Sequence, residues 1–494
     1  MYLETIISPQ TFPPIYWMFA FSILLVIVDA FTKKESKLNC YLAIGVLIFV
    51  IYQALFNVLL QPNSEATSTY FFSDFAGSML NFGKLQEAFN IIFCLSGLLV
   101  IISTKEYLTK VYQHYKEFYS LIFFAIFGMM CIAHSNNLVV LFLGIETMSI
   151  TFYALTGFVR NRETAVEGAL KYFLLGAFAS GFLLYGMAMI YGATGTMYYS
   201  EISASILSLQ ATPMYLKLGI GLTVIGLLFK VSAFPFHQWA PDVYQAAATP
   251  ITGFMSTAGK VAALAGFIGV AYAVMPSDTV EMSILNLNNN IKIIIAVVAA
   301  LTMLIGNITA LQQKNIKRML AYSSVGHAGY MLMGIVADSY DGISAMVYYS
   351  LAYTFTQIGA FTVIAILERK DESNLNISDY AGLAKSQPFL AVMMAMFMFS
   401  LAGIPPFAGF FGKYFIFKAA IDAGFTWLTV VAVITSVIAV YFYLSVIVQM
   451  YFRDREDILQ LEKSPKARIT VALSAIGIIL FALYPLMDFA NILF

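Results

Sequence analysis

The chain alternates between long apolar runs and short polar segments. Most of the runs hold close to the ~20 apolar residues that an α-helix needs to cross the ~30 Å hydrocarbon core of a bilayer. Backbone polar groups cannot stay unpaired in lipid, so we expect helices, and the alternation typical of a membrane β-barrel is absent. The predicted spans are 15–31, 41–60, 87–103, 118–134, 137–158, 165–192, 214–240, 247–274, 289–311, 318–337, 342–367, 388–420, 426–451 and 468–491. The pattern therefore predicts an all-α, polytopic membrane protein with about 14 transmembrane helices.

Lysine and arginine gather in alternate loops. The loops after odd-numbered spans carry most of them, among them Lys33, Lys34, Lys37, Lys105, Lys110, Lys116, Arg160, Arg162, Lys314, Lys317, Arg318, Arg369, Lys370, Lys385, Arg453, Arg455, Lys463, Lys466 and Arg468. The loops after even-numbered spans hold mainly acids, such as Glu65, Asp74, Glu201 and Asp278. The positive-inside rule then places the odd ends in the cytoplasm and both termini outside.

Three of the predicted spans contain prolines, and we expect breaks in spans 7 and 12. Pro235 lies in span 7, Pro405-Pro406 in span 12, and Thr249-Pro250 near the start of span 8. A proline inside a helix removes one backbone hydrogen bond, which is tolerated in a membrane where the broken helix lines a polar cavity or packs in protein.

The positions of these breaks predict an internal repeat. Span 7 is the fourth helix of the set 4–8, and span 12 is the fourth of the set 9–13. Because five is odd, the second set starts on the opposite side of the membrane, which is the arrangement of an inverted repeat. The alternative is two unrelated proline kinks. We therefore expect N-terminal helices in 1–117, a first repeat in 118–274, an inverted second repeat in 275–451, and a connecting segment with the last helix in 452–494.

Composition narrows the function classes. Of the 494 residues, 60% are hydrophobic and 11% are charged, and the formal net charge is zero. These values exclude a soluble enzyme and give no signal for nucleic-acid binding. The three cysteines, Cys40, Cys94 and Cys131, are too far apart for an iron–sulfur, zinc or disulfide framework. No motif for a nucleotide, flavin, haem or metal is present.

Ionisable residues inside the apolar runs are the candidate site. A charge at the bilayer centre costs about 2.5–3.5 kcal/mol on insertion scales, so such a residue is functional by default. Glu146 lies about 13 Å into span 5, Lys230 precedes the break in span 7, and Lys260 lies inside span 8. Burial disfavours charge on a lysine and a nearby carboxylate favours it. A Glu–Lys pair whose separation changes can therefore move a proton, although a static salt bridge is the alternative.

Four further residues extend this set. Lys413 follows the double proline of span 12 and is taken as the repeat counterpart of Lys230. Lys171 is explained nearly as well by a helical pair with Glu167 near the inner end of span 6. His237 follows Pro235, and His327 lies within span 10. Histidine suits a relay between lysines, but each could equally be a hydrogen-bonded core residue.

Several segments resemble the antiporter-like membrane subunits of respiratory complex I. They are GIETMSITFYAL, EGALKYFLLGAFASGFLLYGMAMIYGATG, FKVSAFPFHQWAPDVYQ, QKNIKRMLAYSSVGHAGYMLMG and LAGIPPFAGFFGKY, and the likeness covers nearly the whole chain. The resemblance implies a first-half ion pair between Glu146 and Lys230, a central relay at Lys260, and an exit-side site at Lys413. It also associates Lys171 and His237 with the polar axis.

The resemblance carries expectations about cofactors, partners and location. It implies that NADH, FMN, iron–sulfur clusters and quinone are bound by other subunits and that this chain binds none of them. It implies neighbouring membrane-arm subunits as partners and a bacterial inner membrane as the location. The function expected is proton translocation coupled to quinone reduction elsewhere in the complex. A subunit of a multisubunit Na⁺/H⁺ antiporter and a stand-alone solute transporter remain as alternatives.

Overall fold

The protein is a bundle of long helices. The computed structural model describes residues 12–31, 38–60, 79–111, 117–209, 213–274, 288–369, 373–454 and 464–483. Within these residues there is no strand, only isolated β-bridges such as Asn315 with Asn376. The predictions that concern both termini and several loop residues fall outside the described part: Lys33, Lys34, Lys37, Lys116, Lys370, Arg455, Lys463, Glu65, Asp74 and Asp278.

The helices follow the predicted apolar runs. In chain order they are α2 (Pro14–Phe31), α3 (Leu38–Leu60), α5 (Lys84–Val111), α6 (Glu117–His134), α7 (Leu138–Thr156), α8 (Glu163–Thr194), α9 (Tyr199–Ser208), α10 (Met214–Val231), α11 (Trp239–Ala246), α12 (Thr249–Phe254), the π-helical turn η1 (Met255–Gly259), α13 (Lys260–Val274), α14 (Asn289–Ala310), α15 (Ile316–Ala337), α16 (Tyr340–Leu367), the 3₁₀ turn η2 (Ile377–Tyr380), α17 (Leu383–Ser386), α18 (Pro388–Ala402), α19 (Ala408–Asp422), α20 (Thr426–Phe452) and α21 (Pro465–Leu483).

The predicted multi-pass membrane architecture is confirmed. Twelve helical segments of the described chain are long and apolar enough to cross a membrane, with α12, η1 and α13 counted together. The other two predicted spans are α15 and the broken pair α18–α19. Helix α15 is less apolar because it contains polar residues such as Ser323, Ser324 and His327, and these are buried among the other helices. The short helix α9 was not predicted.

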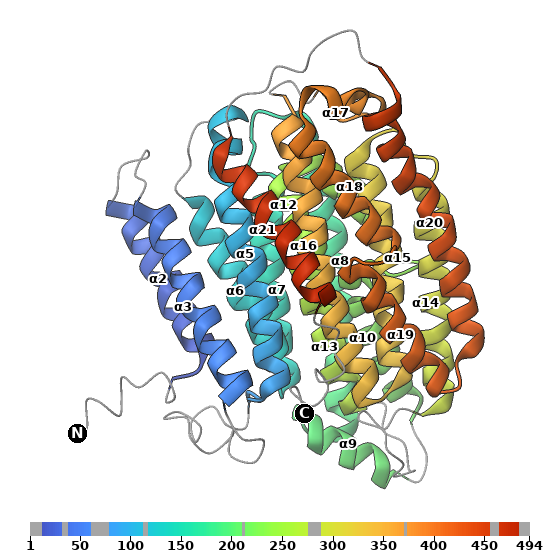
Figure 1. Cartoon of the computed structure of the whole chain (residues 1–494). Coiled ribbons are helices and arrows are strands. Elements are labelled where there is room, and N and C mark those ends of the chain that lie inside the picture. The colour runs from blue at the N-terminus through green and yellow to red at the C-terminus, as the bar shows by residue number, and fades with distance from the viewer. Residues whose placement is uncertain are drawn as a thin grey trace.

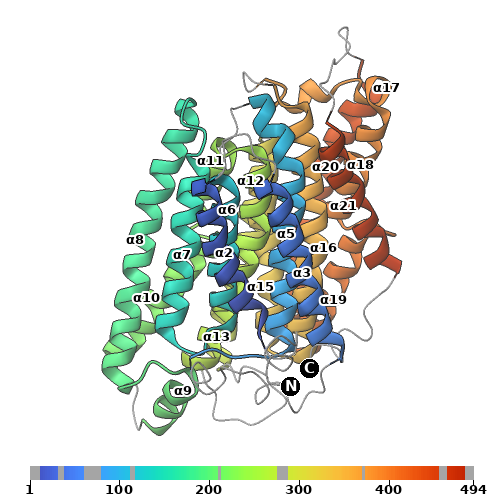
Figure 2. The ribbon, with the colours of Figure 1, turned by 90° about the vertical axis from the view of Figure 1, so that its left-hand side faces the viewer.

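The helices pack in two sets with matching neighbours. In the first, α6 packs on α7, α7 on α8, and α8 on both halves of the broken helix, α10 and α11. In the second, α14 packs on α15, α15 on α16, and α16 on both α18 and α19. Helices α2, α3 and α5, the blue part of Figures 1 and 2, pack beside these sets, with α2 and α5 on α6 and α5 also on α16 and α21. The packing follows the predicted repeat, and the boundaries predicted for it stay a prediction.

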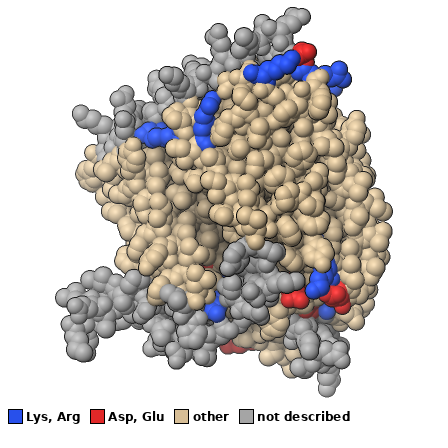
Figure 3. Space-filling model, in the orientation of Figure 1, with Lys and Arg blue, Asp and Glu red and all other residues tan. Residues whose placement is uncertain are grey.

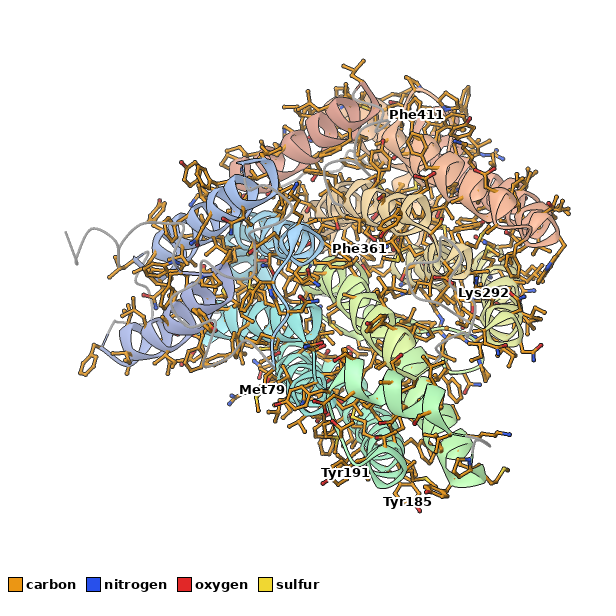
Figure 4. All side chains as sticks on the ribbon, turned by 90° about the horizontal axis from the view of Figure 1, so that it is seen from below. Met79, Tyr185, Tyr191, Lys292, Phe361 and Phe411 are labelled. Carbon is orange, nitrogen blue, oxygen red and sulfur yellow. The ribbon has the colours of Figure 1, made fainter. Side chains whose placement is uncertain are left out.

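Helix α16 is the central column of the bundle. Its most apolar stretch of 18 residues is entirely buried. Phe361, labelled near the centre of the end view in Figure 4, has no exposed surface. By contrast, only 33% of the residues in the corresponding stretches of α2 and α20 are buried. In Figure 3 the charged side chains gather toward the two ends, with a broad uncharged belt between them. These features are those of a protein surrounded by lipid or by other membrane subunits.

Glycine lets α14 and α15 approach closely. A Cβ atom on Gly306 would lie 2.5 Å from the backbone nitrogen of Gly326, which a real side chain cannot do. Small residues at such a crossing let two membrane helices pack backbone to backbone. The close crossing fixes α15, which carries Ser323, Ser324 and His327 of the site described below.

Glu106 of α5 caps a helix far away in the chain. Its two carboxylate oxygens accept the backbone N–H groups of Lys466 and Ala467, at 3.0 Å each, in the first turn of α21. The first N–H groups of a helix have no partner within the helix, and removing a side-chain cap typically costs about 1 kcal/mol. We expect Glu106→Ala to lower the thermal unfolding midpoint of the purified protein measurably, and Glu106→Gln to lower it less. Equal midpoints for wild type and Glu106→Ala would contradict the cap.

Candidate functional site: a chain of buried lysines

Two helices are broken in mid-bundle, as predicted. Helix α10 ends at Val231 with Ser232 in the left-handed region (φ 63°), and α18 ends at Ala402 with Gly403 at φ 82°. The peptide bonds before Pro235 and Pro406 are both cis. Pro250 lies in the first turn of α12, near the start of its span as predicted, where a proline is well tolerated. The interruption of that span is instead the π-helical turn η1.

Lys230 lies in the last turn of α10, at the edge of the first break. Its side chain is buried, and Nζ donates to the Ser149 hydroxyl of α7 at 2.8 Å. The Tyr153 ring lies 6.0 Å from the ammonium group. The C-terminal end of a helix carries partial negative charge, which favours a cation there. Lys230 is thus held by a neutral hydroxyl, an aromatic ring and the end of its own helix.

The direct ion pair between Glu146 and Lys230 does not form in this structure. Among the described residues, no carboxylate oxygen lies within 4 Å of Lys230 Nζ, which donates instead to Ser149, one helical turn after Glu146 on α7. Glu146 still interacts electrostatically with Lys230. Its Oε1 atom is buried and has no hydrogen-bond partner. The two charges are therefore neighbours with an exchangeable contact rather than a closed salt bridge.

Lys260 is the first residue of α13, directly after η1. It is 2% exposed, and Nζ donates to the backbone oxygen of Ser324 at 2.8 Å and contacts the Ser324 hydroxyl as well. The Tyr244 ring centroid lies 5.7 Å from Nζ. A π-helical turn adds a residue to the local winding and often occurs at functional sites. Here it directly precedes the lysine that reaches α15.

His327 of α15 is the centre of a hydrogen-bonded cluster. Nδ1 lies 2.5 Å from the Tyr349 hydroxyl, and Nε2 lies 3.0 Å from the Tyr443 hydroxyl. Tyr443 also hydrogen-bonds to the hydroxyl of Ser323, the neighbour of Ser324. His327 interacts electrostatically with both Lys260 and Lys413. His327 is therefore a hydrogen-bonded core residue, which was one of its two interpretations. It also interacts with two lysines, as a relay requires.

Lys413 of α19 is bound to the end of α18. Nζ donates to the carbonyls of Leu401 and Ala402, at 3.0 Å each, and to the Ser436 hydroxyl at 2.8 Å. The Tyr330 ring lies 5.2 Å away. Lys413 follows its break whereas Lys230 precedes its own, so the two are not matched in sequence position. They are matched in environment, because each ammonium group lies at the C-terminal end of the first half of a broken helix.

The remaining two candidates lie differently. His237 is in the turn between α10 and α11, 9% exposed, with a buried Nδ1 that has no hydrogen-bond partner. Lys171 is not in the buried chain. Its side chain is 47% exposed and pairs with Glu167 at 2.7 Å and with Asp242 at 3.5 Å. An exposed ion pair with Glu167, one of the two interpretations given for Lys171 from its i,i+4 spacing, is thus present in the structure.

The described contacts connect Lys260 with His327 mainly through hydrogen bonds, whereas the links from His327 to Lys413 and from Lys230 to Lys260 are largely ring contacts. From Lys260, hydrogen bonds and adjacent residues lead through Ser324, Ser323 and Tyr443 to His327. Tyr330, in ring contact with His327 at 5.8 Å, links it to Lys413. Between Lys230 and Lys260 the described contacts are largely aromatic, with Trp239 stacked on Phe229 and edge-on to Tyr244. Among the described residues there is no group of three metal-ligating side chains.

Sequence reasoning missed several buried polar residues. Ser149, Tyr349, Tyr443 and Ser436 hold the lysines and His327, but serines and tyrosines inside apolar runs give no distinctive signal. Glu368 was also missed, because it lies at the end of a span. Its carboxylate is fully buried, pairs with Arg162 at 3.1 Å, and accepts from the hydroxyls of Tyr107 and Thr249.

Comparison with known proteins gives consistent matches over most of the chain. Residues 135–439 match the family model described as NADH:quinone oxidoreductase/Mrp antiporter, TM. The chain is 43% identical over 464 residues to NADH-quinone oxidoreductase subunit N 1 of Chloroherpeton thalassium, covering 94% of this chain and 93% of the relative. It is 41% identical over 487 residues to NADH-quinone oxidoreductase subunit N of Chloroflexus aggregans, covering 97% and 95%.

Solved structures share the fold. A chain of respiratory complex I from Thermus thermophilus aligns with a TM-score of 0.77 and 29% identity, covering 96% of this chain and 98% of that one. A chain of the Mrp complex from Dietzia sp. DQ12-45-1b aligns with a TM-score of 0.80 at 18% identity, which speaks for the fold alone.

Proposed function

Because the chain belongs to the family of NADH-quinone oxidoreductase subunit N, we propose that its buried lysines carry protons across the membrane. The chain is a membrane subunit of an NADH:quinone oxidoreductase, and the antiporter-like family fits a role in proton translocation. The residues proposed for the transfer are Glu146, Lys230, Lys260, His327 and Lys413, with His237 at the first break. Lys171 is left outside the buried route because of its exposed ion pairs.

One observation carries the proposal. Lys230, Lys260 and Lys413 are each at most 5% exposed, and none has a carboxylate oxygen within 4 Å among the described residues. Their partners are hydroxyls, carbonyls and aromatic rings. A buried lysine with a fixed counter-ion is locked in its charged form, whereas one among neutral partners can release and regain its proton. Three such lysines in one bundle suit a chain of exchange sites.

The geometry suggests how a proton moves. Ser149 can yield its contact with Lys230 to Glu146, which would hold the proton on Lys230, and the reverse motion would release it. The hydroxyls of Ser324, Ser323 and Tyr443 then connect Lys260 with His327. His327 can bind a proton on either ring nitrogen. Positive charges on Lys260 and Lys413 repel each other, so a proton that binds to one lysine favours release of the proton from the other.

The proposal also covers the coupling to quinone reduction, the partner subunits, and the location and orientation of the chain. Quinone reduction elsewhere in the complex would perturb the chain of charges, with NADH, FMN, iron–sulfur clusters and quinone held by other subunits. We propose neighbouring membrane-arm subunits as the partners, a bacterial inner membrane as the location, and an orientation with both termini outside. The Na⁺/H⁺ antiporter alternative is not favoured, because relatives of 35–45% identity are named as subunit N of the oxidoreductase.

Lys230→Met tests the first exchange site. The substitution keeps the length of the side chain and removes the exchangeable proton. In sealed membrane vesicles containing the assembled complex, we expect the rate of NADH-driven proton translocation to fall by about tenfold or more, a change of at least ~1.4 kcal/mol in a barrier. Lys217→Met is the matched control, because Lys217 is exposed on the same helix. Translocation at the wild-type rate in Lys230→Met would count against the proposal.

A further inference from the structure

A second buried carboxylate lies outside the lysine chain. Glu87, in the first turn of α5, is 2% exposed. Its oxygens accept from the side-chain amides of Asn57 on α3, at 3.2 Å, and of Asn90 on α5, at 2.9 Å. No lysine, arginine or histidine nitrogen lies within 4 Å of it among the described residues. A buried carboxylate with only neutral partners is costly, and taking up a proton removes that cost.

The hydrogen bonds around Glu87 fix the state of a neighbouring histidine. The Asn90 amide nitrogen also lies 2.9 Å from His134 Nε2, and His134 Nδ1 lies 2.8 Å from the backbone oxygen of Asn81. An amide nitrogen only donates and a carbonyl oxygen only accepts. His134 therefore accepts on Nε2 and donates from Nδ1, so its imidazole is neutral and adds no positive charge beside Glu87.

This hydrogen-bond chain leads to a cavity. Asn81, which accepts from His134, lines a cavity of about 410 Å³ together with Phe89, Ser135, Tyr199 and Ala265. The cavity lies at the α9 end of the bundle, which is the lower end in Figure 1 and faces the viewer in Figure 4. Met79, which is labelled in Figure 4, precedes the lining residue Asn81 by two positions. The positive-inside assignment makes this the outer side.

The cavity also borders the helix that carries Lys260. Ala265, Ile268, Gly269 and Tyr272 of α13 form one of its walls. At ~1.5 Å per residue, Ala265 is about 8 Å along α13 from Lys260. The cavity thus lies between the central lysine of the proposed route and the Glu87 cluster, on the side toward which a translocated proton would leave.

We propose that Glu87 is a proton-exchanging carboxyl on the outer section of the translocation route, held in place by Asn90 and exchanging its proton with water from the adjoining cavity, which its helix neighbours Gln86 and Phe89 line. This proposal depends on the proposed function for its role, but not for the existence of the site. In the exchange, an O–H bond forms at Glu87 as one breaks in a protonated water of the cavity, and no electron moves. The titratable groups facing or flanking Glu87 are His134 through Asn90, Lys84 one turn earlier on α5, and Cys94 two turns later.

Infrared spectroscopy of the purified complex tests the site directly. A protonated carboxyl has a C=O stretch that a carboxylate lacks. Acid-minus-alkaline difference spectra are expected to contain a C=O band that is lost in Glu87→Gln and kept in Glu106→Gln, a control that removes a carboxylate from the other end of the same helix. If Glu87→Gln fails to assemble, Glu87→Asp should shift the band instead. Difference spectra that do not change with residue 87 would overturn the proposal.

Proton translocation in sealed vesicles then tests the role. We expect NADH-driven translocation to be slower in Glu87→Gln than in Glu106→Gln. Loss of the C=O band with full translocation would remove Glu87 from the route, even if Lys230→Met abolishes translocation. Full translocation in Lys230→Met would overturn the proposed function, while the Glu87 band, measured without turnover, would still report whether the carboxyl exchanges a proton.

Discussion

Replacing Lys413 by methionine is expected to stop most NADH-driven proton translocation without preventing assembly of the complex. Lys413 is 4% exposed and donates three hydrogen bonds, to two carbonyls at the end of α18 and to Ser436. Methionine has a similar length, and removing the buried charge offsets part of the cost of leaving the two carbonyls and the Ser436 hydroxyl without their donor. The exchangeable proton, however, is lost, and we expect a decrease of about tenfold or more in translocation rate.

Lys418→Met provides the matched control for this prediction. Lys418 lies on the same helix, five residues later, and its side chain is exposed. Both variants remove one lysine from α19, so any general effect of lost charge appears in both. Equal translocation in the two variants, at the wild-type level, would show that Lys413 is structural. Ser436→Ala should give an intermediate effect, since it leaves the lysine but removes one of its three acceptors.

The largest effect on stability is expected from Glu368→Gln. Glu368 has no exposed surface and pairs with Arg162, whose side chain is 8% exposed. The carboxylate also accepts from Tyr107 of α5 and Thr249 of α12, so this cluster joins three helices and the loop before α8. Removing one partner of a buried ion pair leaves the other charge uncompensated, at a cost of about 3–5 kcal/mol. This cost is a large fraction of the net stability of a folded protein, which is typically about 5–15 kcal/mol.

We expect Glu368→Gln to reduce the yield of folded protein and to lower its thermal unfolding midpoint by several degrees. The comparison is Asp454→Asn, which breaks the exposed pair with Lys385, where both side chains are about four-fifths exposed, at 78% and 83%. An exposed ion pair contributes about 0–1 kcal/mol. The prediction fails if the two variants unfold at the same temperature.

Most of the fold could be predicted from the sequence because lipid restricts the possible structures. Each apolar run had to be a helix, and the prolines at 235 and 405–406 marked real breaks. The short helix α9 was not predictable in this way, because it lies outside the apolar runs. The π-helical turn before Lys260 was also missed, since local winding depends on how α12 and α13 pack rather than on the apolar pattern.

The candidate site was predicted in its charges and missed in its partners. Lys230, Lys260 and Lys413 were identifiable because a lysine in an apolar run is costly and therefore conspicuous. Their contacts come from helices distant in sequence, such as Ser149 for Lys230, and no local pattern encodes them. Lys171 shows the opposite case, because its i,i+4 spacing with Glu167 correctly indicated a surface pair. Glu87 and Glu368 lie near helix ends, where a carboxylate looks ordinary until its burial is known.

The central claim is that protons pass through Lys260. The most direct measurement is the number of protons translocated per NADH oxidised, in proteoliposomes containing the purified complex, for wild type, Lys260→Met and Lys260→Arg. Among the described residues, Lys260 Nζ hydrogen-bonds to the oxygens of Ser324 and lies over the Tyr244 ring, and it has no carboxylate partner within 4 Å, so methionine should leave the bundle assembled. A ratio clearly below wild type in Lys260→Met is predicted. A wild-type ratio in Lys260→Met, with NADH oxidation intact, would contradict the account.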